Sequence, residues 1–200
     1  MKKILTLAGV TLALIWACTG GPTPSSTGRD AGFSQDSIHV RGRAIAKASF
    51  EALSAQLTKA MAEGGVSHAL SFCHENAYPI TDSLSATYRV RIRRVAERCR
   101  NPQNSPNAQE QEILEQFKAL KAKGYDLKKV DTAVVLGPDR VLFAKPILLQ
   151  PQCMVCHGTV GESVAESDYR EIRRLYPGDR AVGFSAGDLR GMWAIYFEGQ

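Results

Sequence analysis

The chain has 200 residues, of which 44% are hydrophobic and 22% are charged, and its formal net charge is +5 at pH 7. After a leader and a linker are set aside, this length fits one globular domain, and we find no internal repeat. The basic excess is mild and no long basic stretch is interleaved with aromatic residues, so we expect no nucleic-acid partner.

The start of the chain has the layout of a secretory signal peptide, which we predict over residues 1–17. Lys2 and Lys3 precede an apolar run that is too short to span a membrane comfortably. The run ends directly before Cys18, and this junction resembles the processing site of a bacterial lipoprotein, although Trp16 stands where a small residue is usual. Cys18 is therefore the predicted lipidated first residue, and ordinary signal cleavage nearby is the alternative.

Residues 18–36 are rich in Gly, Pro, Ser and Thr and hold almost no core-forming side chains, which is typical of a flexible tether. The folded domain is then predicted over residues 37–200. We expect an exported protein of the bacterial periplasm or cell envelope, anchored to a membrane through the lipid on Cys18.

The first part of the folded domain is predicted to be helical. Apolar residues at helical spacing predict a helix over residues 41–63, which Gly64-Gly65 ends. A second helix is predicted over residues 67–77, ending before Pro79. Its apolar stripe consists of Val66, Leu70, Cys73 and Ala77, so Cys73 points inward and His74 lies on the edge of the same stripe.

Residues 88–94 alternate between apolar residues and arginines, which predicts a strand with one apolar and one basic face. Further on, Asn107 and Glu110 form a capping-box pair for a helix that Gly124 closes. The remaining predicted elements are strands over 131–136 and 141–149 joined by a turn at 137–139, a helix over 162–176, and a strand over 192–197. This order predicts a mixed α+β domain built around an antiparallel sheet.

One pentapeptide, Cys153-Met154-Val155-Cys156-His157, carries the clearest chemical signal. Two thiols three positions apart and followed by histidine are typical of c-type haem attachment, in which both sulfurs bond the porphyrin and the histidine ligates the iron. The alternatives are a redox dithiol or half of a zinc site, but a zinc ribbon needs a second Cys-x-x-Cys pair and the sequence has none. We therefore predict one covalent haem c on Cys153 and Cys156, with His157 below the iron.

The arginines of the predicted strand over 88–94 have two interpretations. Positive side chains discourage pairing at the edge of a sheet, so Arg89 and Arg91 are expected on a solvated edge strand. The alternative is that Arg89 and Arg91 contact the anionic propionates of the haem.

Several stretches together resemble one known family. They are residues 69–73, 100–104, 157–158, 176–184 and 187–191. In this order they resemble the PAS-like, c-type haem-binding domain family catalogued as a domain of unknown function, the Tll-type haem domain. The resemblance implies a PAS-like antiparallel sheet flanked by long N-terminal helices, a covalent haem c, and a redox- or ligand-sensing role. It also implies that Cys73 is the second axial ligand, opposite His157.

From the residues alone, three possibilities are open, two of which supply the second axial ligand. Cys73 lies on an apolar stripe, and a thiolate is a good iron ligand. His74 is its rival, and a Cys73–Cys99 disulfide in an oxidising compartment is the third possibility. The remaining candidates are weaker, being expected on the surface, in the core or inside the attachment loop: Met61, His68, Met154 and Met192.

We therefore expect a monohaem protein that senses redox state or a small ligand and acts through an unidentified redox or signalling partner. A membrane-tethered electron carrier is the alternative, because two protein ligands on the iron suit electron transfer. An enzyme such as a peroxidase would need a distal acid–base pair, and no arrangement of histidine and arginine in the sequence identifies one.

Overall fold

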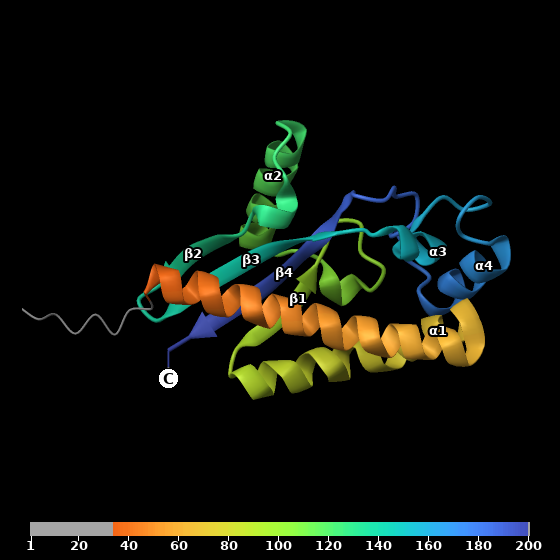
Figure 1. Ribbon diagram of the computed structural model, residues 1–200, viewed down its shortest axis with the longest axis horizontal. Helices are drawn as coiled ribbons and strands as arrows, with labels where there is room; N and C mark the ends of the chain where they lie inside the picture. The colour runs from red at the N-terminus through yellow and green to blue at the C-terminus, as the bar shows by residue number, and fades with distance from the viewer. Residues whose placement is uncertain (1–33, 200) are drawn as a thin grey trace, which may run out of the picture. The chain divides into compact units, whose positions relative to one another are not determined.

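The computed structural model describes residues 34–199, which fold around an antiparallel sheet of four strands in the order β1-β4-β3-β2 (Figure 1). The predicted signal peptide, Cys18 and most of the predicted tether lie outside the described residues. The strands are β1 (Arg91–Val95), β2 (Thr132–Gly137), β3 (Arg140–Leu148) and β4 (Leu189–Glu198). The helices are α1 (Gln35–Tyr88), α2 (Ala108–Ala122), α3 (Met154–His157) and α4 (Glu166–Leu175).

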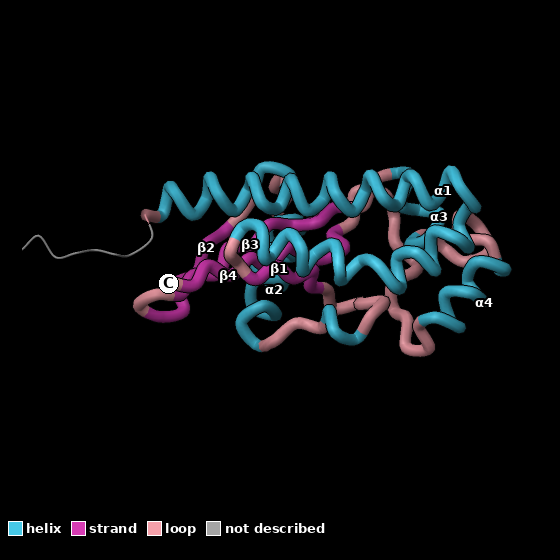
Figure 2. The backbone as a smooth tube through the Cα atoms, turned by 90° about the horizontal axis from the view of Figure 1, so that it is seen from below, coloured by secondary structure: helices cyan, strands magenta, loops and turns pink. Residues whose placement is uncertain are grey.

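The long α1 is a pair of helices joined at a break. Gly64 and Gly65 leave helical geometry, and Gly65 adopts a φ of 67° and a ψ of −160°, a conformation open to glycine and strained for other residues. Figures 1 and 2 both show the two halves lying side by side after the chain turns back. The predicted break is confirmed. The helix begins at Gln35, within the last residues of the predicted tether.

The predicted end of the second helical half, before Pro79, is wrong. The helix continues through Pro79 to Tyr88 and ends where Arg89 adopts a left-handed conformation with φ 52°. Proline removes one backbone hydrogen bond. Burial of Ala77 and Thr81 on either side of Pro79 supports the continued helix, and the Thr81 hydroxyl donates to the Ala77 carbonyl at 2.8 Å. Tertiary packing therefore overrides the local helix-breaking signal.

The sheet is covered on both faces. Alternate residues of each strand point to opposite faces, and the two resulting cores are distinct. On one face the first half of α1 packs on Val141, Phe143, Trp193, Ile195 and Phe197. On the other face α2 packs on Leu142, Ala144, Met192, Ala194 and Tyr196.

The remaining local predictions are mostly confirmed. Asn107 and Glu110 form the capping box of α2, each side chain accepting the other's backbone N–H at 2.9 Å. Strands β2 and β3 form the predicted hairpin. The strand predicted from residue 88 starts three residues later, because Tyr88 still belongs to α1 and Arg89 ends it. The predicted α+β class, an antiparallel sheet with long N-terminal helices, is confirmed. Within residues 34–199 no helix is long and apolar enough to cross a membrane.

Candidate functional site

The Cys-x-x-Cys-His pentapeptide follows directly after the end of β3. A short 3-10 turn at Pro151–Cys153 leads into α3, so Cys153 and Cys156 lie one helical turn apart. Both are free thiols, as are Cys73 and Cys99. Gly158 comes next, and a Cβ there would lie 2.8 Å from the Met154 carbonyl oxygen and 3.0 Å from the Ser163 Cβ. The chain after the motif is packed too closely for any larger residue.

The ring of His157 is fixed by a backbone hydrogen bond. Its Nδ1 donates to the Ala181 carbonyl oxygen at 2.7 Å, and two further backbone bonds, from Gly183 to Gly158 and from Phe184 to His157, hold the same loop against the motif. Burial, reinforced by the nearby guanidinium groups of Arg100 and Arg190, places the pKa of His157 well below its usual value. A neutral imidazole with its proton on Nδ1 leaves the Nε2 lone pair available to a metal.

Arg100 joins three segments of the site. Its Nε donates to Asp179 Oδ1 at 2.8 Å and its Nη2 donates to the Cys156 carbonyl at 2.6 Å. The Arg100 side chain is 13% exposed and that of Asp179 is 0% exposed. The other oxygen of this carboxylate, Asp179 Oδ2, is buried and has no hydrogen-bond partner within the described part of the chain. The Arg100 side chain therefore joins the loop after β1 to the loop after α4 by an ion pair and to the motif by a hydrogen bond.

Cys73 belongs to the same cluster. Burial raises the pKa of the Cys73 thiol, while the positive charges of Arg94 and Arg100 oppose that increase. Burial likewise raises the pKa of Cys156 to about 11, and the charge of Cys73 contributes to that increase. One turn earlier on the helix, Leu70 packs in a small core with Val164 and Ile172, against which Cys156 also packs. The structure thus brings Cys73 to the motif from a position about eighty residues earlier.

The other predicted iron ligands are placed differently. His74 is exposed, and its ring meets the Tyr176 ring edge-on at 4.9 Å between centroids. His68 is 48% exposed and lies 3.6 Å from Glu63. Met192 is fully buried in the core beneath α2, while Met61 and Met154 are half-buried.

The Cys73–Cys99 disulfide is not formed. Both thiols are free, and the buried Cys99 Sγ lies 3.4 Å from the Ser105 hydroxyl. The Cys99 thiol therefore shares a hydrogen bond with Ser105, in the loop after β1.

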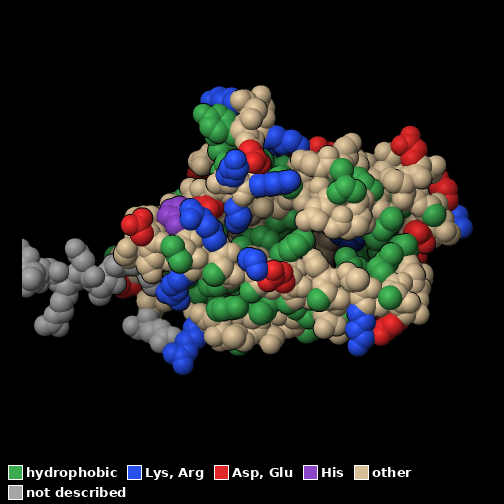
Figure 3. All heavy atoms as spheres, in the orientation of Figure 1, with side chains coloured by type: hydrophobic (Ala, Val, Ile, Leu, Met, Phe, Trp, Pro, Cys, Tyr) green, Lys and Arg blue, Asp and Glu red, His purple; other side chains and the backbone are tan. Residues whose placement is uncertain are grey.

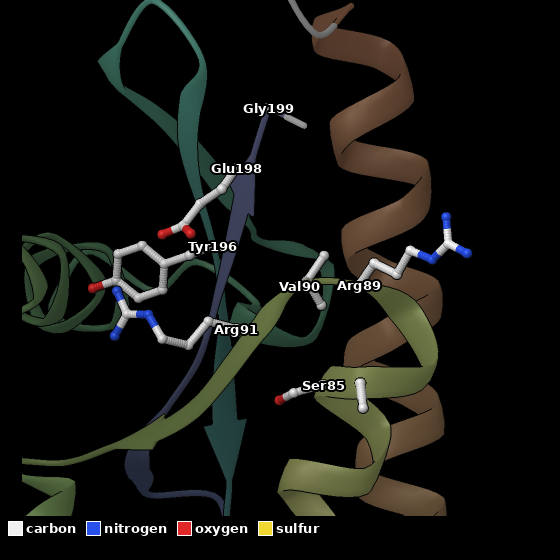
Figure 4. Close-up of a pocket in the computed structure, with 8 residues that line it drawn as sticks. Ser85, Arg89, Val90, Arg91, Tyr196, Glu198 and Gly199 are labelled. Carbon is white, nitrogen blue, oxygen red and sulfur yellow. The ribbon is translucent and has the colours of Figure 1, made fainter.

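Arg89 and Arg91 lie away from the motif. They line a pocket of about 440 Å³ at the far end of the sheet, where the Arg91 guanidinium lies 3.7 Å from the centre of the Tyr196 ring (Figure 4). The distance from Arg91 to the motif can be measured along β3. Arg91 on β1 lies at the level of Tyr196 on β4 and Leu142 on β3, and β3 continues for six residues to Leu148 before the motif begins. Six residues of strand span about 20 Å. The structure does not bring these two arginines to the motif.

Arginines that the sequence reasoning did not select lie there instead. Arg94 acts electrostatically on Cys73, and both Arg100 and Arg190 act on His157. Arg100 and Arg190 each lie in one of the stretches that resemble the known family, and this position could have marked them as candidate site residues. Arg94 lies on the predicted strand, but the alternation does not distinguish it from its neighbours.

The residues present fit a covalently held haem. Two free thiols, a neutral histidine with Nε2 available, a third thiol and three arginines gather at one end of the sheet. Figure 3 shows the surface hollowed between α1 and α3, with hydrophobic side chains around the opening. Within residues 34–199 no three His, Cys, Asp or Glu side chains are arranged to hold a bare metal ion.

Comparison with known proteins gives one family and one structure. The model of the Tll0287-like family matches residues 34–197. Among solved structures, the crystal structure of the cyanobacterial heme-protein Tll0287 matches with a TM-score of 0.55 and 24% identity, covering 80% of this chain and 95% of that chain. No curated protein matches. At this level of identity the structural match shows a shared fold.

Proposed function

The chain belongs to the Tll0287-like family, and from this premise we propose that it is a monohaem c-type protein. Cys153 and Cys156 would hold the porphyrin by thioether bonds, His157 Nε2 would ligate the iron, and the Cys73 thiolate would ligate it from the opposite side. The matching solved structure is itself described as a heme-protein, which supports the proposal. The group would supply one-electron redox chemistry at the iron.

The observation that carries the proposal is the hydrogen bond from His157 Nδ1 to the Ala181 carbonyl at 2.7 Å. Histidines that ligate metals usually donate their second ring nitrogen to a carbonyl or carboxylate, which fixes both the tautomer and the orientation of the ring. Here the neutral ring, held in one orientation, comes directly after two free thiols. The arrangement therefore supports ligation through Nε2.

Cys73 is the better supported second ligand. Its half-buried thiol lies in the cluster formed by the motif, whereas the exposed His74 ring packs on Tyr176. Burial raises the pKa of Cys73, so a positive charge nearby is needed to hold the thiolate at neutral pH. A bound haem iron would supply such a charge, together with Arg94 and Arg100, since a coordinated thiol is deprotonated.

The test is a set of absorption spectra of the oxidised and reduced holoprotein. Cys73→Ser should change the spectrum of the oxidised protein, while His74→Ala, the adjacent control, should leave it unchanged. An unaltered spectrum in Cys73→Ser would rule out thiolate ligation. Cys153→Ser/Cys156→Ser should lose the haem that remains attached to the chain after denaturation, and retention of that haem would overturn the attachment itself.

The physiological role we propose is sensing of redox state or of a small ligand, with the signal passed to a partner protein. Burial raises the pKa of Cys73, so its thiolate would be protonated more readily if reduction lowered the charge of a bound haem iron. Release of Cys73 would then leave room for a diatomic ligand. Rapid carbon monoxide binding by the reduced protein, faster still in Cys73→Ser, supports this role.

No carbon monoxide binding, together with fast exchange of electrons with a small redox protein, would instead support the alternative role of electron carrier. In that role Cys73 and His157 would both remain bound in the two oxidation states.

We also propose that the protein is exported and anchored by a lipid on Cys18. The basic and apolar leader followed by this cysteine supports it. Mass spectrometry of the mature N-terminus tests it: a diacylglycerol-modified Cys18 is expected, and a free N-terminus elsewhere would refute the anchor.

A further inference from the structure

Two arginines at the site have no ion-pair partner within the described part of the chain. Arg94 on β1 and Arg190 on β4 are half-buried. Within residues 34–199 neither guanidinium makes a hydrogen bond or an ion pair, although each offers five N–H donors. Arg100 differs, because Asp179 neutralises its charge at 2.8 Å. The cluster of three arginines and one carboxylate therefore has two positive charges in excess.

Both unpaired groups face the site already described. Arg94 is two residues after Ile92, whose side chain packs on the α1 side of the sheet, so it points toward the same side. There it acts electrostatically on Cys73 and on Tyr176. Arg190 lies where the pairing of β3 with β4 shifts between Ile147 and Leu148, and it is the β4 residue left without a partner.

A shift of this kind re-aims a side chain relative to its neighbours. Arg190 acts on His157 and is itself affected by Arg94, so the two guanidinium groups lie near each other and near the proposed iron ligands. Arg94 is associated with Cys73 and Arg190 with His157.

The uncompensated charges come at a cost. Burial, reinforced by the charges of Arg100 and Arg94 and only partly opposed by Asp179, lowers the pKa of Arg190 to about 10. Burial also lowers the pKa of Arg94. A charge removed from water is tolerated when it is paired and hydrogen-bonded. Two neighbouring arginines without such partners therefore favour the binding of anions at this place. Guanidinium groups match carboxylates in a two-point geometry.

We propose that Arg94 and Arg190 bind the two propionate carboxylates of the haem, one each. This rests on the proposed function and extends it by naming the residues that recognise the anionic edge of the ring. Two unpaired guanidinium groups meet two carboxylates, and the cluster becomes neutral. The arginines so used are different from Arg89 and Arg91 at the far end of the sheet.

The test is the midpoint potential of the holoprotein in Arg94→Gln and Arg190→Gln. Positive charge near the iron favours the reduced form, and net charge at the site is one determinant of its potential. Each substitution should lower the one-electron reduction equilibrium constant by about tenfold, which is 59 mV. Arg91→Gln is the matched control: it removes the same charge from the same sheet, about 20 Å from the motif, and should shift the potential little.

Lysine variants separate charge from packing. Arg94→Lys and Arg190→Lys keep the charge and should stay near the unmodified potential, which a purely structural role would not predict. If a Gln variant holds no haem but its Lys counterpart does, the proposal also stands. Shifts no larger than that of Arg91→Gln, in variants that retain covalent haem, would overturn it. If the unmodified chain itself attaches no haem, the proposed function fails instead, so the two failures are distinguishable.

Discussion

Removing the guanidinium of Arg100 should destabilise the holoprotein more than removing any exposed ion-pair partner. Arg100→Gln leaves the Asp179 carboxylate without its ion-pair partner at a position that is 0% exposed, while its second oxygen already lacks a hydrogen-bond partner. Breaking a buried ion pair by deleting one member costs about 3–5 kcal/mol. At about 2–4 °C per kcal/mol for a domain of this size, the midpoint of thermal unfolding should fall by roughly 6–20 °C.

A double-mutant cycle gives the sharper measurement. Arg100→Gln/Asp179→Asn removes both charges and leaves a neutral pair that can still share a hydrogen bond, so it should be more stable than Arg100→Gln alone. Unfolding by guanidinium chloride, followed through the haem absorbance and by circular dichroism, yields each free energy. Arg174→Gln is the control, because Arg174 is 66% exposed and its pair with Glu171 is screened by water.

Two results would refute this account of Arg100. One is a loss below about 1 kcal/mol, the value typical of an exposed pair. The other is strict additivity in the cycle, because additivity would mean that Arg100 and Asp179 do not interact.

Two further predictions concern the motif and the opposite end of α1. Gly158→Ala should reduce the yield of covalently bound haem several-fold, because its Cβ would lie 2.8 Å from the Met154 carbonyl oxygen. Overpacking of this kind typically costs about 1–3 kcal/mol. Gly178→Ala is the control and should leave the yield unchanged, because a Cβ at Gly178 meets nothing within 4 Å. Although burial alone would raise the pKa of Asp131, hydrogen bonds from Arg43 and His39 lower it. Its stabilising effect should therefore be fully present above the unfolded-state pKa of about 3.9 and be lost progressively as the pH falls through the lower folded-state pKa. The stabilities of the protein and of Asp131→Asn should converge in acid, and a constant difference from neutral pH to below the folded-state pKa would contradict this.

The elements predicted from the sequence are those that neighbouring residues determine. The capping box of Asn107 and Glu110 and the glycine pair at 64–65 each depend on contacts within a few residues. The end of α1 does not: Pro79 stops a helix locally, and only burial of Ala77 and Thr81 against the rest of the fold carries the helix past it.

The arginines illustrate a second limit. Alternation along residues 88–94 predicts which side chains share a face, but not which end of the strand lies at the motif. That end is set by the antiparallel pairing of β1 with β4, which puts Arg91 opposite Tyr196 and Arg94 opposite Trp193. Register is a long-range property, and no local pattern contains it. For the same reason the sequence interpretation included Arg89 and Arg91 and missed Arg94.

The choice between Cys73 and His74 depends on the rotation of one helix. Successive residues are turned by about 100° around the axis, so only one of these two can point at the motif. The row of side chains four residues apart through Ala69, Ala77 and Thr81 is buried, with exposed fractions of 1%, 7% and 4%, and Cys73 lies on that row. Two of these residues are alanines and one is a threonine, so hydrophobicity alone marks the row weakly. Because Gly64 and Gly65 break the helix, the rotation of the second half of α1 is not set by the first half. Packing of this small-residue row is what turns Cys73, and not His74, toward the motif.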